Sequence, residues 1–381
     1  MDRIYLDHNA TKPVDPRVLE AMLPALREGF GNASSLHWFG QQARAALDDA
    51  RAEIARLIGA NPAEVVFTSS GTEADNLALR GAAGIARPPR RGIVYSAIEH
   101  HAVMNTAKSL AEEGWPVASV RATADGTVDL DDLAAKVDET TALVAVMFAN
   151  NETGVIQPVK EVVTLAHARG ALVHCDAVQA AGKVPIDVRA LDVDLLALSG
   201  HKIYAPKGVG VLYVKRGTRL RPWVRGGSQE RNRRAGTENI PGIVGMGRAA
   251  AIAREELGGE TLRLAALRDR LEERLLAIPG TRRNGDGPRV PNTTNVSFAG
   301  IEAESLLMAL DLAGVAVSTG AACAAGAVEP SHVLRGMGLP LERVQGSVRF
   351  SLGRGTREAD LDRAAETVAT AVAKQRSLAR V

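Results

Sequence analysis

The chain has 381 residues, which is enough to bury a large core and to form two domains. Its formal net charge is +2, and it has no basic block or aromatic stripe of the kind that binds nucleic acid. No apolar run approaches the ~18 residues needed to span a membrane, and two cysteines cannot form a disulfide framework. Residues 1–7 lack the features of a signal peptide, and no Cys/His spacing resembles a zinc site. We therefore expect a cytoplasmic protein that binds no metal, no membrane and no nucleic acid.

Short apolar runs alternate with helical patterns between residues 15 and 215. This alternation predicts an α/β fold in which helices cover both faces of a mainly parallel sheet. Ligands bind beyond the carboxyl ends of the strands in such sheets, so the residues that follow each run are candidates for a site. The runs cover residues 65–68, 93–96, 143–148, 171–175, 195–198 and 210–214.

The pattern changes near residue 259, where a helical stretch over residues 260–278 begins. We expect strands at residues 294–298 and 347–352, followed by a terminal helix from about residue 357. These elements indicate a smaller α/β domain, beside which the first dozen or so residues are expected to pack. We thus predict a large domain over residues 15–258 and a small domain formed by residues 1–14 and 259–381.

Polar residues with recognisable chemistry follow several of the runs. Ser70 and Glu73 fit a capping box, so a helix begins here, and Gly71 would let a phosphate approach its free N–H groups. An ordinary capped helix is the alternative. His100 could stack on a flat ring and move protons near neutral pH, or it could belong to a surface histidine pair. Asn151 lies in an amide-rich stretch that could equally be a simple turn.

Two further runs end in an acid and an amine. Asp176 ends an apolar run, where a carboxylate is costly unless it is paired or hydrogen bonded, and Lys202 follows the next run. Pyridoxal phosphate requires such a pair, because an amine forms its Schiff base and a carboxylate keeps its pyridine nitrogen protonated. A lysine after a strand is by itself most often structural or exposed. The hypothesis therefore depends on the other groups at the same edge, which include Gln179, Ser199 and His201.

Two candidates lie in the C-terminal part of the chain. Cys323 belongs to a glycine-bounded stretch of very small residues, which predicts an exposed nucleophile on a mobile loop; a small residue in a tight turn is the alternative. A thiol with the ordinary pKa of about 8.5 would need a neighbouring base or cation to become reactive. Arg354 follows the last predicted strand and could hold the carboxylate of an amino acid, or it could be a surface arginine. Cys175 lies inside an apolar run and is expected to be buried and inert.

Taken together, these residues resemble the cysteine desulfurases of the nitrogen-fixation and iron–sulfur-assembly type, which are class V, fold-type-I pyridoxal phosphate enzymes. The resemblance covers nearly the whole chain and includes SGHK at residues 199–202 and RAGTEN at residues 234–239. Residues 329–335 are similar to the nitrogen-fixation branch in particular. The resemblance implies a large domain around a seven-stranded, mostly parallel sheet, a smaller α/β domain, and a homodimer.

The resemblance also implies a role for each cofactor-binding residue. Lys202 would form the Schiff base, Asp176 would pair with the pyridine nitrogen, and Gln179 would bind the phenolic oxygen. His100 would stack on the ring and act as an acid–base. The residues expected to hold the phosphate are Thr72, Ser199 and His201, with Gly71 at the helix start and Thr237 reaching in from the partner subunit.

The implied reaction converts L-cysteine to L-alanine. Asn151 and Arg354 would bind the substrate carboxylate, and Cys323 would attack the substrate sulfur and become a persulfide. That sulfur would pass to an acceptor such as an iron–sulfur cluster scaffold, or supply another thio-cofactor. The alternatives are a selenocysteine lyase or an aminotransferase of the same fold, and a non-catalytic scaffold of a sulfur-transfer complex. An aminotransferase would not require Cys323.

Overall fold

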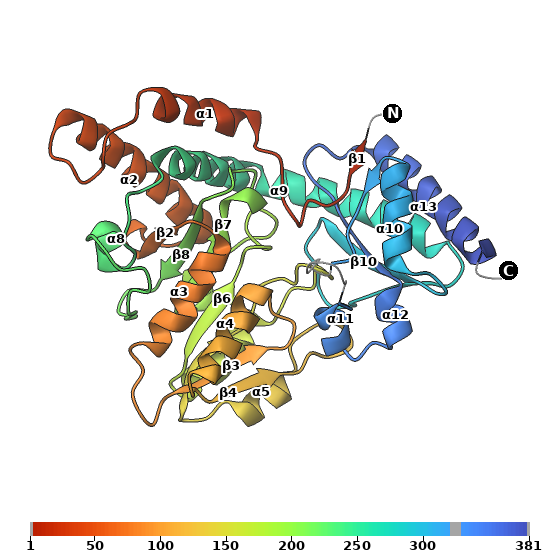
Figure 1. Ribbon diagram of the computed structural model, residues 1–381, viewed down its shortest axis with the longest axis horizontal. Helices are drawn as coiled ribbons and strands as arrows, with labels where there is room; N and C mark the ends of the chain where they lie inside the picture. The colour runs from red at the N-terminus through yellow and green to blue at the C-terminus, as the bar shows by residue number, and fades with distance from the viewer. Residues whose placement is uncertain (1–2, 321–328, 379–381) are drawn as a thin grey trace.

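The computed structural model describes residues 3–320 and 329–378 of the chain. Two parts lie side by side in Figure 1, and the long helix α9 (Ile240–Leu276) runs through both of them. The larger part holds a seven-stranded sheet, and the smaller part holds a three-stranded sheet with a separate pair of short strands. In the described ranges, no helix is long and apolar enough to cross a membrane.

The seven strands are arranged in the order β2-β8-β7-β6-β5-β3-β4. Strand β8 runs antiparallel to both of its neighbours, and every other pair in this sheet is parallel. The expected seven-stranded, mostly parallel sheet is therefore confirmed. The strands are β2 (Val65–Thr68), β3 (Gly92–Ser96), β4 (Val117–Val120), β5 (Thr141–Ala145), β6 (Leu172–Asp176), β7 (Leu195–Ser199) and β8 (Gly210–Val214).

Two strands differ from the sequence prediction. The edge strand β4 was not predicted, because its side chains are mostly only partly buried and it lacks a continuous apolar run. The predicted run over residues 143–148 ends as a strand at Ala145. The next residues, Val146 to Phe148, are buried as well, so hydrophobicity alone did not mark where the strand ends.

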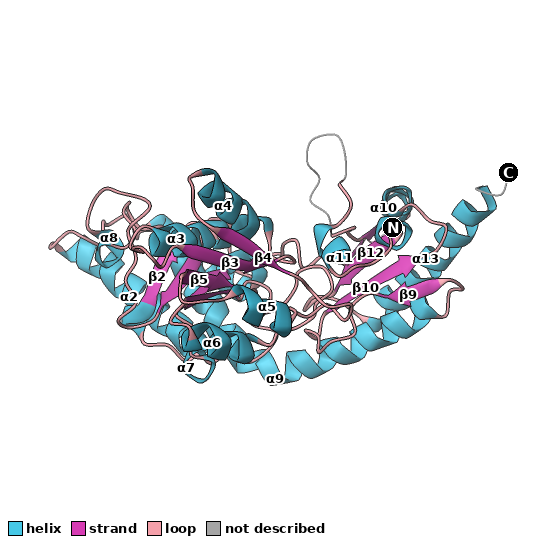
Figure 2. Ribbon diagram, turned by 90° about the horizontal axis from the view of Figure 1, so that it is seen from below, coloured by secondary structure: helices cyan, strands magenta, loops and turns pink. Residues whose placement is uncertain are grey.

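Helices cover both faces of this sheet (Figure 2). One buried cluster joins α3 and α4 to the sheet, and a second cluster joins α2, α5, α6 and α9 to its other face. The helices of the larger part are α1 (Pro16–Arg27), α2 (Trp38–Ile58), α3 (Gly71–Ala83), α4 (His101–Glu112), α5 (Leu130–Lys136), α6 (Val159–Ala168), α7 (Val188–Leu191) and α8 (Gln229–Asn232).

The smaller part is built on an antiparallel sheet in the order β12-β10-β9, so the two predicted strands and the predicted terminal helix are confirmed. The N-terminal strand pairs in parallel with β11, and Leu6 joins the buried core of this part. The elements are β1 (Ile4–Tyr5), β9 (Thr281–Arg283), β10 (Thr293–Phe298), β11 (Val315–Ala316), β12 (Ser347–Ser351), α10 (Ala303–Leu312), α11 (His332–Gly336), α12 (Leu341–Gln345) and α13 (Glu358–Leu378).

Helix α9 begins 20 residues before the helix predicted at residue 260. Gly258 and Gly259 resemble a break in sequence, but both lie in the helix with open space around them. The weak helix propensity of glycine, about 1 kcal/mol each, is offset because α9 is buried on both sides of them. Met246 packs in the core of the larger part and Leu271 in that of the smaller part. The predicted boundary at residues 258 and 259 thus falls within one helix and stays a prediction.

Candidate active site

A cavity of about 380 Å³ lies between the two parts, at the carboxyl ends of the parallel strands. Residues from the loops after β2, β3, β5, β6 and β7 line it, together with residues of the N-terminal segment and of β12. The sequence-predicted residues that line this cavity are Gly71, Thr72, His100, Asn151, Asp176, Gln179, Ser199, His201 and Lys202. The fold therefore brings most of the candidate site together.

The acid at the end of β6 lies in an unusual electrostatic environment. Burial raises the pKa of Asp176 to about 6, although the Val178 N–H at 2.9 Å and the charge of Lys202 act in the opposite direction. One ligand atom each of Asp75, His100 and Asp176 lie within 4.8 Å of one another. Two carboxyl groups this close cannot both ionise easily without a cation. The cavity floor is therefore suited to a positively charged group.

The amine at the cavity is Lys202, which directly follows β7 in a short 3-10 turn. Its Nζ donates to the carbonyl oxygens of Asn9 and Ala10 at 2.5 and 2.6 Å. Burial, followed by the positive charge of Arg349, lowers the pKa of Lys202 to about 8. A fraction of this amine is therefore unprotonated near neutral pH and available as a nucleophile or a base.

The start of helix α3 forms one wall of the cavity. Ser70 caps the helix as expected, because its Oγ accepts from the Glu73 N–H at 3.1 Å, but the Glu73 carboxylate reaches back to the Ser69 N–H at 2.7 Å. A Cβ atom at Gly71 would lie 2.9 Å from the Val178 side chain. The site therefore presents a bare backbone at a helix N-terminus, an arrangement that accommodates a phosphate.

The ring of His100 has a defined tautomer. It caps helix α4, with Nδ1 accepting from the Ala102 N–H at 3.1 Å, so the neutral ring carries its proton on Nε2. The ring is open to the cavity, yet the atoms packed around it and then the charge of Lys202 lower the pKa of His100 to about 4. A neutral ring is the form expected to stack on an aromatic cofactor.

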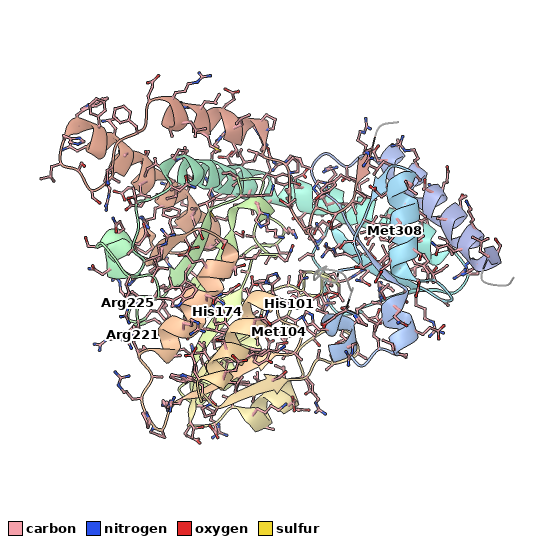
Figure 3. All side chains as sticks on the ribbon, in the orientation of Figure 1. His101, Met104, His174, Arg221, Arg225 and Met308 are labelled. Atoms are coloured by element: carbon pink, nitrogen blue, oxygen red, sulfur yellow. The ribbon has the colours of Figure 1, made fainter. Side chains whose placement is uncertain are left out.

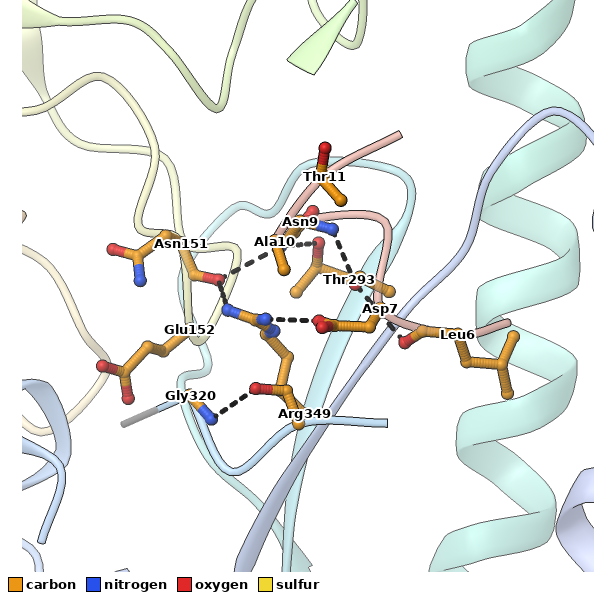
Figure 4. A network of polar contacts seen from close by, with 12 residues as sticks. Leu6, Asp7, Asn9, Ala10, Thr11, Asn151, Glu152, Thr293, Gly320 and Arg349 are labelled. Carbon is orange, nitrogen blue, oxygen red and sulfur yellow. Dashed lines mark hydrogen bonds and ion pairs between the residues drawn. The ribbon is translucent and has the colours of Figure 1, made fainter. Parts of the chain in front are cut away.

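A guanidinium that the sequence analysis missed also lines the cavity. Arg349 on β12 donates to the Asn151 carbonyl at 2.9 Å and to Asp7 Oδ1 at 2.6 Å (Figure 4). Its buried Nε and the buried Oδ1 of Asn151 have no hydrogen-bond partner in the part of the chain that the structure describes. Two buried polar groups beside the cavity are thus left unpaired by the described residues.

Arg354, predicted as the carboxylate anchor, does not line this cavity. Its guanidinium forms ion pairs with Asp15 and with Glu256, and it stacks at 4.5 Å on the ring of Tyr204. Arg354 comes three residues after the end of β12, whereas Arg349 lies within this strand. The Arg349 side chain points from the strand towards Asp7 and Asn151. The arginine that lines the cavity is thus Arg349, five positions before Arg354, and the role predicted for Arg354 stays a prediction.

Two other candidates are not in the cavity. Thr237 is exposed and lines a different hollow, beside Glu230 and Arg234. Cys323 lies outside the described residues; the chain is described up to Gly320, which lines the cavity. Cys175 is free and fully buried in β6, as expected.

A set of buried groups that the sequence did not reveal lies at and below the cavity floor. His174 Nε2 lies 2.9 Å from Asp75 Oδ1, and both residues are almost completely buried. Burial, and then the charge of Asp176, raises the pKa of Asp75 and of Glu99. Their only sequence signal was their place in or after apolar runs. At the cavity rim, the ring of His101 at the start of α4 (Figure 3) lies 4.7 Å from the ring of His332 at the start of α11.

Comparisons with known proteins agree with this geometry. The family model described as aminotransferase class-V matches residues 4–364. The chain is 50% identical over 380 residues to a cysteine desulfurase of Trichormus azollae, covering 99% of this chain and 95% of that protein. It is 48% identical to a cysteine desulfurase of Enterobacter agglomerans, covering 99% and 94% of the two chains.

Solved structures agree as well. A NifS-like protein superimposes with a TM-score of 0.91 at 38% identity, covering 98% of this chain and 100% of the other. A structure described as SspA in complex with cysteine superimposes with a TM-score of 0.81 at 33% identity, covering 92% and 98%. The chain therefore belongs to the class V aminotransferase family and, within it, to the NifS-like cysteine desulfurases.

Proposed function

We propose that this chain uses pyridoxal phosphate to convert L-cysteine to L-alanine and transfers the sulfur to Cys323. The observation that carries the proposal is the convergence of an amine, a buried acid and a helix N-terminus on one cavity. These groups are Lys202, Asp176 and the backbone at Gly71. The same cavity offers the guanidinium of Arg349 for the carboxylate of an amino acid.

The residues present suit the cofactor. Asp176 is a buried acid with a raised pKa, and a protonated ring nitrogen would supply a cation beside it in addition to Lys202. When bound, pyridoxal phosphate supplies an electron sink for carbanions formed at the substrate. Lys202 would carry it, Gln179 would bind its phenolic oxygen, and His100 would stack on its ring. The groups that would hold its phosphate are the backbone at Gly71 and the side chains of Thr72, Ser199 and His201.

The proton transfers fall to Lys202 and His100. Because the pKa of Lys202 is about 8, its Nζ can take a proton from the substrate α-carbon and return one at neutral pH. The neutral His100 ring exposes Nε2–H, which can donate to a leaving or reacting group. These two groups have separate partners in the structure, so each can act without displacing the other.

The substrate carboxylate would bind at Arg349 and Asn151 rather than at Arg354. Arg349 is 4% exposed, and Asp7 already neutralises part of its charge. Both residues line the cavity, where the guanidinium keeps further N–H donors and the Asn151 amide nitrogen can donate to a carboxylate. An arginine in this setting favours a planar, charged carboxylate over a neutral group.

Cys323 follows the cavity residue Gly320 by three positions in the sequence. Its thiolate would attack the substrate sulfur, so that the S–S bond forms as the Cβ–S bond breaks. The electron pair of the broken bond is protonated at carbon. The balanced sum is L-cysteine plus one thiol giving L-alanine plus one persulfide, with no external oxidant.

A second copy of the chain would complete the site. Thr237 is exposed in its own chain, so it is free to reach a partner's phosphate-binding corner. Large apolar side chains before and at the start of α2 are also exposed: Phe30 by 77%, Leu36 by 91% and Trp38 by 64%. Such a cluster on one surface favours burial against a partner subunit. The sulfur acceptor would be a separate protein, such as an iron–sulfur cluster scaffold.

A single-turnover experiment tests this function. Purified protein with bound cofactor is mixed with L-cysteine without reductant, and alanine and persulfide are counted. We expect about one alanine per chain and a persulfide at Cys323, and neither in Cys323→Ala, which keeps the cofactor absorbance. Alanine formation by Cys323→Ala at the wild-type rate would refute the role of Cys323. Reaction with other amino acids but not L-cysteine would indicate an aminotransferase, and preference for selenocysteine would indicate the lyase.

A further inference from the structure

A buried lysine that is absent from the cavity wall lies directly behind it. Lys183 is 2% exposed and follows Gln179 by four residues, in the turn after β6. Gly182, with a φ of +66°, reverses the chain just before it. The Lys183 backbone is held by Thr261 of α9, whose Oγ1 donates to the Lys183 carbonyl at 2.9 Å. The Lys183 side chain therefore points back towards the side chain of Gln179.

The amine of Lys183 has two acceptors. Nζ donates to Gln179 Oε1 at 2.6 Å and to Asn9 Oδ1 at 3.0 Å. Both are uncharged amide oxygens, and no carboxylate pairs with Lys183 in the described part of the chain. Burial, and then the cations Lys12, Lys202 and Arg349, lower the pKa of Lys183. A buried amine without a counter-ion is costly, which calls for a reason other than stability.

The hydrogen bonds determine which end of the Gln179 amide faces the cavity. The Asn9 carbonyl can only accept, so the Gln179 amide atom beside it must be Nε2, which leaves Oε1 for the Lys183 amine. Nε2 then donates one hydrogen to the Asn9 carbonyl at 2.9 Å. Its second hydrogen has no partner in the described residues, and Gln179 lines the cavity. The amide thus presents a donor there, not an oxygen.

The geometry points to Lys183 as a positioning residue: it clamps Gln179 and Asn9 so that the Gln179 amide donates to an oxyanion of the bound cofactor. One amine holds both partners of this clamp, so its removal loosens Gln179 Oε1 and the Asn9 side chain together. Without the clamp, Gln179 can turn its amide or swing away from the cavity. This inference rests on the proposed function, because it assumes that pyridoxal phosphate fills the cavity.

The test is a pH titration of the visible absorbance of the cofactor-bound protein. A donor at the phenolic oxygen stabilises the deprotonated chromophore, so loss of that donor raises its apparent pKa. We expect Lys183→Met, which nearly keeps the side-chain length, to raise the midpoint by about one pH unit, the size expected for one hydrogen bond to a charged group. Gln179→Leu should raise it at least as much. Lys215→Met is the matched control, since Lys215 pairs with Asp192 outside the cavity, and its midpoint should not move.

The double variant separates positioning from simple charge. If Lys183 acts through Gln179, Lys183→Met should add almost nothing in the Gln179→Leu background. An equal shift in both backgrounds would mean that the lysine acts by its charge alone and would overturn the inference. So would an unchanged midpoint in Lys183→Met. If that variant does not fold, Lys183→Leu takes its place in the same cycle. Failure of the wild-type protein to bind pyridoxal phosphate would instead refute the proposed function.

Discussion

Replacement of Arg349 by lysine tests where the substrate carboxylate binds. The guanidinium already uses one N–H of Nη1 on the Asn151 carbonyl and one N–H of Nη2 on Asp7, which leaves the second N–H of each nitrogen for the substrate. A lysine has one amine and cannot serve all three positions in a plane. Loss of one charge-assisted hydrogen bond, worth about 1.5–3 kcal/mol, should lower kcat/KM for L-cysteine by roughly 10- to 150-fold. Most of the change should lie in KM, because the proton-transfer groups are untouched.

The assay is steady-state alanine formation over a range of L-cysteine concentrations. Arg354→Gln is the matched control, because Arg17 still pairs with Asp15 and Glu256 when Arg354 is removed. Its kcat/KM should stay within about twofold of wild type, as for a substitution outside the site. Circular dichroism confirms that both variants are folded. Wild-type activity in Arg349→Lys, or an equal loss in Arg354→Gln, would refute the assignment.

Three further predictions concern stability and the cofactor. Glu230→Gln should lower the free energy of unfolding in urea by about 3 kcal/mol, because the buried Arg51 then keeps only the half-exposed Asp48, at 3.9 Å, as an ion-pair partner; unchanged stability would contradict this. Burial raises the pKa of Glu272, but hydrogen bonds chiefly from Arg289 outweigh it and lower the pKa to about 2. The stabilisation by Glu272 is therefore complete above about pH 5 and is lost as the pH falls towards 2. In urea titrations at several pH values, the free energy of unfolding of Glu272→Gln should depend less on acid than that of the wild type. Parallel pH dependences of the two proteins would contradict this prediction. Gly71→Ala should weaken cofactor binding about tenfold, because the added Cβ would lie too close to the Val178 side chain. Retention of the visible cofactor absorbance after dialysis measures this binding. Full retention would contradict the prediction and show that Val178 can move aside.

The sequence by itself determined six of the seven strands of the large sheet and nine of the residues that line the cavity. Apolar runs that end abruptly in polar residues predicted the strands and the side chains at their tips, and His100, Asp176 and Lys202 do lie together. This inference works because parallel strands joined through helices must all end at the same edge. No long-range information was needed to bring these three residues to one place.

Only the tertiary structure decided which arginine faces the cavity and what supports its floor. Arg349 meets Asp7 and Asn151, which lie 342 and 198 residues away in sequence, so no local pattern distinguishes it from Arg354. The same holds for Lys183, whose partner Asn9 comes from the N-terminal segment, 174 residues away. Local patterns report the period and polarity of a segment, whereas burial and charge pairing depend on which distant segment packs against it.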